Sequence, residues 1–136
     1  MSAPFTHLHF HTHYSLLDGA IKVKGLGGYL KDIGYSSCAI TDHGNLHGVV
    51  EFEKEMKKAG VKPIIGMEAY VAKINRHHRS YSRPGPNAFH TVLLCENKQG
   101  YDNLVKLSSI GYSEGKYYGK PRIDHELLEK HSGGLI

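Results

Sequence analysis

Apolar and polar residues follow one another along the chain in short blocks that predict an α/β protein. The apolar run Ser37–Thr41 is bounded by Gly34 and the turn-prone letters DHGN, which is typical of a buried parallel strand. Residues Leu46–Ala59 place apolar side chains at helical spacing among lysines and glutamates, and Gly60 ends this amphipathic helix. Lys62–Ala72 (KPIIGMEAYVA) is predicted to be the next strand.

The remaining blocks extend this rhythm in both directions. In Phe5–His13 histidine alternates with other residues, which predicts a strand with a histidine face. Val23–Ile33 suits a short helix, which its glycines weaken. The expected elements are a strand at Phe5–His13, a helix at Val23–Ile33, a strand at Phe89–Cys95, a helix at Gln99–Gly111 and a helix that Asp124 caps and that runs through Lys130. Such an order favours parallel strands joined by right-handed crossovers.

Length and composition bound the class of protein. With 136 residues, of which 40% are hydrophobic and 22% charged, the chain is expected to form one globular domain. No apolar run approaches the roughly 20 residues that cross a bilayer, and the start MSAPFTHLHF lacks the layout of a signal peptide. A cytoplasmic location without a membrane partner follows. Cys38 and Cys95 lie in apolar surroundings and are interpreted as buried core residues.

Two basic segments interrupt the regular pattern. The chain carries a formal charge of +4, and Lys73–Arg83 and Lys116–Arg122 mix cations with tyrosines. Such a mixture can contact phosphates and stack on unpaired bases. Basic loops are also common in proteins that bind no nucleic acid, so a solvated loop is the alternative interpretation.

The eleven histidines are the unusual feature of the composition. Alternate residues of a strand lie about 6.6 Å apart on one face, so only an adjacent histidine pair can share a metal ion. Asp42 and His43 directly follow one predicted strand, and Glu68 falls within the next. Because the carboxyl ends of parallel strands converge, these residues together have the composition of a Zn, Mn or Fe site. Individually, Asp42 could cap a helix, His43 could fill a turn and Glu68 could pair with a lysine.

Four segments of the chain resemble the signature segments of PHP (polymerase and histidinol phosphatase) domains. They are LHFHTHYSLLDGA, AITDHGNLHG, KPIIGMEAYV and FHTVLLCENKQGYDNLVKL. The combination is most similar to the PHP domain of bacterial DNA polymerase III alpha subunits. The resemblance implies that residues 1–136 are the amino-terminal portion of a distorted (β/α)7 barrel, truncated at the carboxyl end, that holds up to three metal ions.

The resemblance also assigns roles to particular residues. It implies metal ligands at His9, His11, Asp18, His43, Glu68 and His90, and catalytic roles for Asp42, His43 and Glu68. Asp42 is expected to orient His43 or a metal-bound water. The implied metals are Zn or Mn, with Fe or Mg as alternatives. His90 precedes the apolar letters VLLC, so in a simple parallel strand it would lie at the wrong end of the sheet. The histidines without an implied ligand role are His7, His13, His47, His77, His78, His125 and His131.

The function implied by the resemblance is metal-dependent phosphodiester hydrolysis, as 3′–5′ exonuclease proofreading during DNA replication. DNA, the remainder of a polymerase chain and replisome subunits are the implied partners. Two alternatives stay open: a metal-stabilised scaffold without catalysis, and a stand-alone phosphatase similar to histidinol phosphatase. Further metal ligands of the family are expected beyond Ile136, so the fragment alone is expected to be inactive.

Overall fold

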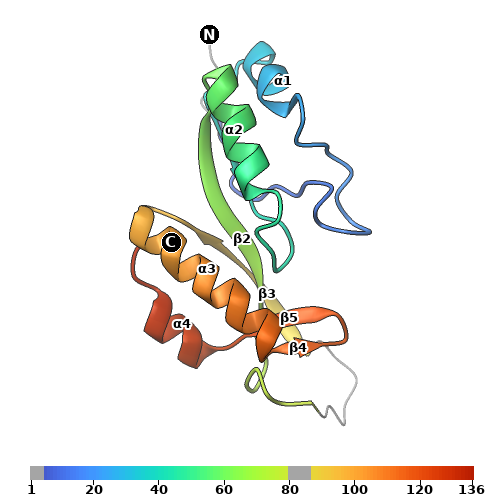
Figure 1. Ribbon diagram of the computed structural model, residues 1–136, viewed down its shortest axis with the longest axis vertical. Coiled ribbons are helices and arrows are strands. Elements are labelled where there is room, and N and C mark those ends of the chain that lie inside the picture. The colour runs from blue at the N-terminus through green and yellow to red at the C-terminus, as the bar shows by residue number, and fades with distance from the viewer. Residues whose placement is uncertain (1–4, 80–86) are drawn as a thin grey trace.

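The computed structural model describes residues 5–79 and 87–136 and shows a mixed sheet built around one long strand, β2 (Lys62–Ala72). The strand β1 (Ser37–Ile40) runs parallel to the first residues of β2, and β3 (Ala88–Leu94) runs antiparallel to its remainder. Further along β2, β5 (Lys120–Ile123) pairs in parallel and forms a hairpin with β4 (Lys116–Tyr117). Figure 1 shows β2 running through the length of the molecule.

Four helices accompany the strands in the described part of the chain. They are α1 (Leu26–Asp32), α2 (Val49–Ala59), α3 (Lys98–Ser113) and α4 (His125–His131). In Figure 1, α1 and α2 lie along one half of β2, and α3 and α4 lie along the other. Within the described residues, no helix has both the length and the apolar character needed to span a membrane.

Alternation along β2 separates its apolar packing from its polar chemistry. Met67, Ala69 and Val71 are buried in a cluster with side chains of α3 and β5. Successive side chains of a strand point to opposite faces, so Glu68 and Tyr70 face away from this cluster. A second cluster packs α1 and α2 against β1. The sheet therefore has a helix-covered face and an opposite face that carries the candidate chemistry.

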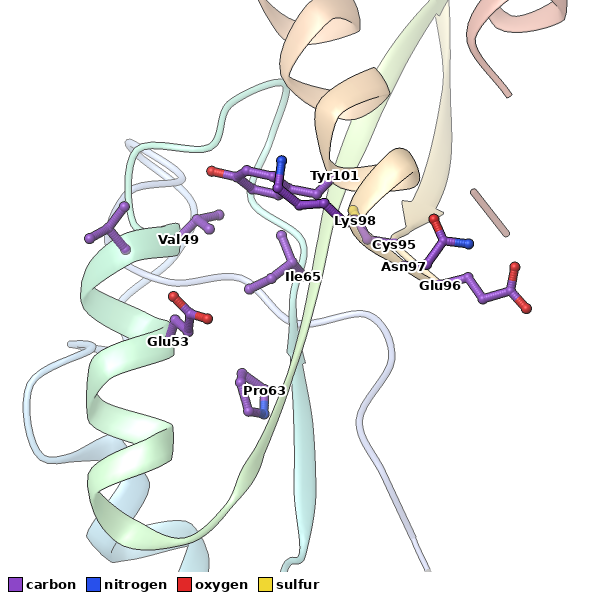
Figure 2. A pocket seen from close by; sticks show the side chains of 10 residues that line it. Val49, Glu53, Pro63, Ile65, Cys95, Glu96, Asn97, Lys98 and Tyr101 are labelled. Atoms are coloured by element: carbon purple, nitrogen blue, oxygen red, sulfur yellow. The ribbon is translucent and has the colours of Figure 1, made fainter. Parts of the chain in front are cut away.

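A groove of about 460 Å³ lies between α2 and the start of α3 (Figure 2). Val49, Ile65 and Tyr101 line it. Ile65 is an even number of residues from Met67, so the groove lies on the helix-covered face of β2. It is therefore separate from the face that carries Glu68.

The predicted strand Phe5–His13 is wrong. The segment follows β1 through hydrogen bonds from Ala39 N to His7 O (2.8 Å) and from Thr41 N to Phe10 O (2.9 Å). Between these two bonds the segment advances by three residues and β1 by only two. A regular parallel ladder requires both strands to advance by the same number of residues. The Phe10 amide donates instead to Thr41 Oγ1 (2.7 Å), and the segment stays irregular.

The helices were predicted well, apart from their starts. The first helix begins only at Leu26, because Gly25 takes a left-handed conformation with φ 83°. The second begins at Val49 and ends at Ala59, because Gly60 takes a left-handed conformation with φ 74°. The predicted cap of the last helix is confirmed, since the Asp124 side chain accepts a hydrogen bond from Leu127 N.

The expectation of parallel strands throughout is wrong for β3. Because β3 runs antiparallel to β2, His90 pairs in register with Tyr70 and lies on the same side of the sheet. The strand's direction removes the conflict over His90, which a parallel strand would have placed at the far end.

The basic segments are neither plain solvated loops nor free basic patches where the structure describes them. Lys116–Arg122 forms the β4–β5 hairpin, and Arg122 is fully buried. Its guanidinium donates to the carbonyl oxygens of Gly115, Arg76 and His78. Arg76 itself pairs with Asp124 at 3.0 Å. These cations tie the loop after β2 to the hairpin, and residues 80–83 of the first segment lie outside the described residues.

The two cysteines differ in burial. Cys38 is buried as predicted, but Cys95 is only half-buried, because it lies at the end of β3 beside Leu135. Burial raises the pKa of each thiol to about 11. Both thiols are therefore protonated at neutral pH, and neither is a ready nucleophile or metal ligand.

Candidate metal centre

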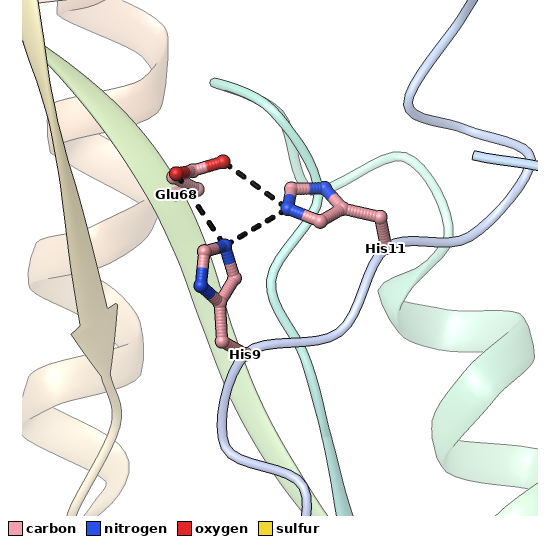
Figure 3. Close-up of side chains that lie close together, drawn as sticks. All are labelled: His9, His11 and Glu68. Atoms are coloured by element: carbon pink, nitrogen blue, oxygen red, sulfur yellow. Dashed lines mark hydrogen bonds and ion pairs between the residues drawn. The ribbon is translucent and has the colours of Figure 1, made fainter. Parts of the chain in front are cut away.

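The candidate site lies where the amino-terminal segment crosses the polar face of β2. His9 Nε2 and His11 Nε2 are 3.0 Å apart. They approach the two carboxylate oxygens of Glu68, at 3.4 Å from Oε1 and 3.1 Å from Oε2 respectively. Figure 3 shows both imidazoles reaching from the coil toward Glu68 on the strand. The predicted histidine pair therefore meets the predicted glutamate.

His43 enters the site from the loop after β1. A parallel bridge between His43 and Glu68 places the two residues side by side. His43 Nδ1 lies 2.8 Å from Glu68 Oε2, and its Nε2 lies 2.6 Å from Asp18 Oδ2. One imidazole thus links the buried carboxylate of Glu68 to the exposed carboxylate of Asp18.

His90 completes the set from β3, on the other edge of β2. Its Nδ1 lies 3.1 Å from Glu68 Oε1. Four of the other five residues predicted as metal ligands thus contact the Glu68 carboxylate, and Asp18 is linked to it through His43. The remaining histidines belong to none of the candidate metal groups found among residues 5–79 and 87–136.

Asp42 lies behind the site and does not face the shared space. Its carboxylate is buried and accepts hydrogen bonds from Thr12 N (2.7 Å), Thr12 Oγ1 (2.8 Å) and Ser15 Oγ (2.6 Å). Asp42 therefore holds the amino-terminal segment against the end of β1. Its link to the site runs through Ser15, whose hydroxyl also contacts His11.

Ser15 fixes the proton on His11. The Ser15 hydroxyl gives its hydrogen to Asp42, so its oxygen can only accept from His11 Nδ1, 2.9 Å away, and from His43 N, 3.1 Å away. His11 thus carries its proton on Nδ1 and presents a lone pair on Nε2 toward Glu68. Such a hydrogen bond to the second nitrogen commonly orients a metal-binding histidine.

Sequence reasoning missed Thr12, Ser15 and Tyr70. Hydroxyl residues carry no periodic signal, and the side chains of Thr12 and Ser15 matter only because the segment folds back on Asp42. Tyr70 was hidden within an apolar strand pattern, although its position two residues after Glu68 placed it on the polar face.

The charges in the site favour ligands that are free of protons. Burial raises the pKa of Glu68, but His43, His90 and His9 together outweigh burial and leave this pKa below its ordinary value. Burial, followed by the neighbouring His43, lowers the pKa of His11. The hydrogen bond and charge of His43 lower the pKa of Asp18. At neutral pH the site therefore offers carboxylates and a neutral imidazole, the forms that bind metals.

The sequence matches the PHP domain family over residues 7–136. The chain belongs to the PHP domain family. It is also similar to curated DNA polymerase III alpha subunits, so the resemblance proposed from the sequence is confirmed. Over 132 residues it is 52% identical to that subunit from Borreliella burgdorferi and 51% identical to the one from Helicobacter pylori, in each case across 97% of this chain and 11% of the relative. The subunit from Aquifex aeolicus is 48% identical over 141 residues, which is 100% of this chain and 12% of the relative. The chain thus spans about a tenth of the length of these relatives.

A solved structure supports the fold. An amidohydrolase from Chromobacterium violaceum, described with bound sulfate and no metal, superposes with a TM-score of 0.53 at 23% identity, covering 79% of this chain and 33% of that chain. The expected α/β fold of PHP type is thereby confirmed.

The residues of this PHP domain fit divalent metal ions. His43 Nδ1 and Glu68 Oε2 are buried and 2.8 Å apart, yet neither has a hydrogen-bond partner within the described part of the chain. Two buried acceptor atoms aimed at each other are costly unless a cation lies between them or close by. Three overlapping groups have ligand atoms within 4.8 Å of one another: His9 with His11 and Glu68, His11 with Asp18 and His43, and His43 with Glu68 and His90. Imidazole with carboxylate is a donor set suited to Zn, Mn or Fe.

Proposed function

We propose that this PHP domain hydrolyses phosphodiesters with the help of divalent metal ions, as a 3′–5′ exonuclease within a chain of the DNA polymerase III alpha type. The observation that carries the proposal is the convergence of four histidines on the buried Glu68 carboxylate, with Asp18 reached through His43. The similarity to polymerase subunits favours this setting over a stand-alone phosphatase.

The site is buried at its base and open at its rim. The Glu68 side chain is 7% exposed, whereas those of His9, His90 and Asp18 are 53%, 42% and 62% exposed. A phosphate group can therefore approach from solvent while Glu68 stays fixed beneath it. Bound divalent ions would supply Lewis acidity and a water of lowered pKa. Glu68, His43, His9, His11, Asp18 and His90 would hold them.

Each of the predicted catalytic residues has a distinct part in this proposal. Glu68 provides the negative charge common to all four histidine contacts, and His43 connects it to Asp18. Asp42 keeps Ser15 in place, and Ser15 in turn directs His11 Nε2 toward Glu68. Asp42 is thus proposed as a positioning residue.

Metals and partners follow from the same reasoning. Zn or Mn suits the donor set, with Fe or Mg as alternatives. DNA, the rest of the polymerase chain and replisome subunits are the proposed partners, in the cytoplasm.

The proposal is tested in the complete chain on a primer with a mismatched 3′ end. With Mn²⁺ or Zn²⁺ present, wild type should release the terminal nucleotide, and Glu68→Gln should slow release by more than the roughly 10- to 100-fold that loss of an outer hydrogen-bond partner costs. Primer extension by the same preparation reports whether the variant is folded. Equal release by Glu68→Gln and wild type would refute the assignment.

A metal-stabilised scaffold is the second candidate, and one observation favours it. The site joins the amino-terminal segment, the loop after β1, β2 and β3, so a bound ion would tie these four parts of the chain together. A scaffold predicts that chelation lowers the unfolding temperature although no metal or substrate yields hydrolysis. Release of nucleotides by wild type that Glu68→Gln abolishes would exclude a purely structural role.

A further inference from the structure

A small cavity adjoins the metal centre and shares His43 with it. The cavity measures about 200 Å³. Its lining includes Tyr14, Asn45, His47, Tyr70, Tyr112 and Pro121. Sites that enclose whole drug-sized ligands measure roughly 300–1,000 Å³, so this cavity has room for about one planar ring system. Aromatic side chains dominate its walls.

Tyr70 lines this cavity and carries a hydroxyl donor that the described residues leave unused. The residue is 9% exposed, and its hydroxyl makes no hydrogen bond to the described residues. Its ring lies nearly parallel to that of His43, with an interplanar angle of 18° and centroids 5.9 Å apart. The phenol hydroxyl can donate a hydrogen bond to a ligand acceptor.

Another wall offers a flat face, and a positive charge lies close to Tyr70. Tyr112 is 38% exposed, and its ring centroid lies 6.1 Å from that of His47. Lys120 Nζ lies 5.1 Å from the centre of the Tyr70 ring. The Asn45 amide is already engaged, because it donates to His43 O and accepts from His47 N. The cavity thus suits a flat aromatic ligand that carries acceptor atoms and is attached to an anion.

We propose that this cavity is a base-binding subsite that holds the nucleobase of the nucleotide whose phosphate lies at the metal centre. Tyr112 supplies a stacking face, and the Tyr70 hydroxyl donates to an acceptor on the edge of the base. Stacking is tolerant of sequence because every base has a π-face, so the subsite favours no single base strongly. The identity of the ligand rests on the proposed function; the cavity and its unpaired phenol do not.

The test measures binding of two probes to the complete chain with Mn²⁺ by equilibrium dialysis. The probes are thymidine 5′-monophosphate and 2-deoxyribose 5-phosphate, which lacks the base. Tyr112→Ala should raise the Kd of the nucleotide by roughly 5- to 100-fold, the range that stacking on one aromatic ring is worth, and leave the Kd of the sugar phosphate unchanged. Tyr112→Phe keeps the ring and should bind as wild type does. Tyr29→Ala, on the exposed side of α1, is the matched control.

Tyr70→Phe provides a second, independent variant. It removes only the hydroxyl and should weaken nucleotide binding by a few-fold without affecting the sugar phosphate. Binding elsewhere on the chain is common to all variants, so only differences between variants are compared. The proposal is overturned if both tyrosine truncations leave nucleotide affinity at the wild-type value, or if they weaken both probes equally.

The result also separates this proposal from the hydrolase assignment. Base-dependent binding that needs Tyr112, in a chain that hydrolyses nothing, would overturn the hydrolase and support the subsite. Hydrolysis that proceeds at the same rate whether or not Tyr112 or the terminal base is present would overturn the subsite alone.

Discussion

At the scale of single residues, Glu68 organises the site because its two oxygens contact every predicted imidazole ligand. Its position in the middle of a strand fixes these oxygens, and burial prevents water from screening them. Ser15 and Asp42 perform the complementary task for His11, since their hydrogen bonds determine which imidazole nitrogen is free. The proposed ligands are thus in place without an ion, which would lower the cost of binding one.

Replacing Ser15 by alanine should weaken metal binding without abolishing the fold. The variant removes the acceptor for His11 Nδ1, so the ring loses its fixed orientation, and we expect metal affinity to fall by roughly 10- to 100-fold. Titration of the complete chain with Zn²⁺ against a competing chelator measures the change. Ser109→Ala, on the exposed side of α3, removes a hydroxyl that bonds within its own helix and contacts none of the candidate ligands, so it should bind metal as wild type does. Equal affinities for Ser15→Ala and Ser109→Ala would contradict the orienting role.

At the scale of elements, the sequence predicted the parts whose signals are local. The amphipathic helix that Gly60 ends and the cap at Asp124 depend on residues near in sequence, and both appear as predicted. The prediction of a strand at Phe5–His13 was wrong because alternating histidines can also occur in a coil. Here hydrogen bonds to β1 hold the backbone of that coil at only a few points. The β4–β5 hairpin was missed because its stabilising residue, Arg122, is a cation that the pattern placed in solvent.

The turn that carries Asp18 tolerates no side chain at Gly19. A Cβ atom there would lie 1.9 Å from the carbonyl oxygen of Thr12, so Gly19→Ala should force the turn away from the segment. We expect the Asp18 contact to His43 to be lost and the number of metal equivalents per chain to fall. Gly28→Ala is the control, since a Cβ there meets nothing within 4 Å, and in α1 it should stabilise the protein by up to about 1 kcal/mol. Metal analysis and urea unfolding of both variants check this; full metal content in Gly19→Ala would refute it.

Asp124 joins α4 to the loop after β2, and its contribution to the stability of the protein should depend on pH. Burial raises the pKa of this carboxyl, but hydrogen bonds from Arg76 and Leu127 outweigh burial and lower the pKa below the ordinary 3.8. The stabilising effect is therefore complete above pH 3.8 and is lost as the pH falls through the lower folded-state value. Asp124→Asn keeps a capping oxygen but not the charge, and Asp124→Ala loses both.

We expect Asp124→Ala to lower the free energy of unfolding at neutral pH by about 2–4 kcal/mol, because it also leaves Arg76 without its buried partner. Asp124→Asn should lose less. Both variants should show a shallower fall in stability below pH 3.8 than wild type does. Urea unfolding from pH 3 to pH 7 measures these effects, and an unchanged acid dependence in both variants would contradict them.

At the scale of the whole molecule, β2 is the common support of the two apolar clusters and of the metal centre. The candidate ligands could be named from the sequence through the family resemblance, but their assembly depends on contacts between segments up to 81 positions apart in the numbering, from His9 to His90. The sequence alone did not give the location of His90 in the sheet. That location depends on the direction of β3, which is set by pairing with β2 and not by the residues of β3 itself. Likewise, the cavity beside His43 exists only because α3 brings Tyr112 close to the loop after β1.

The most direct test of the metal centre is anomalous X-ray diffraction from crystals of the complete chain grown with Mn²⁺. We predict anomalous peaks within bonding distance of Glu68 and of at least two of the imidazoles of His9, His11, His43 and His90. Crystals of Glu68→Gln should show these peaks reduced or lost. Well-ordered side chains of these residues with no anomalous peak among them, at saturating Mn²⁺, would contradict the account.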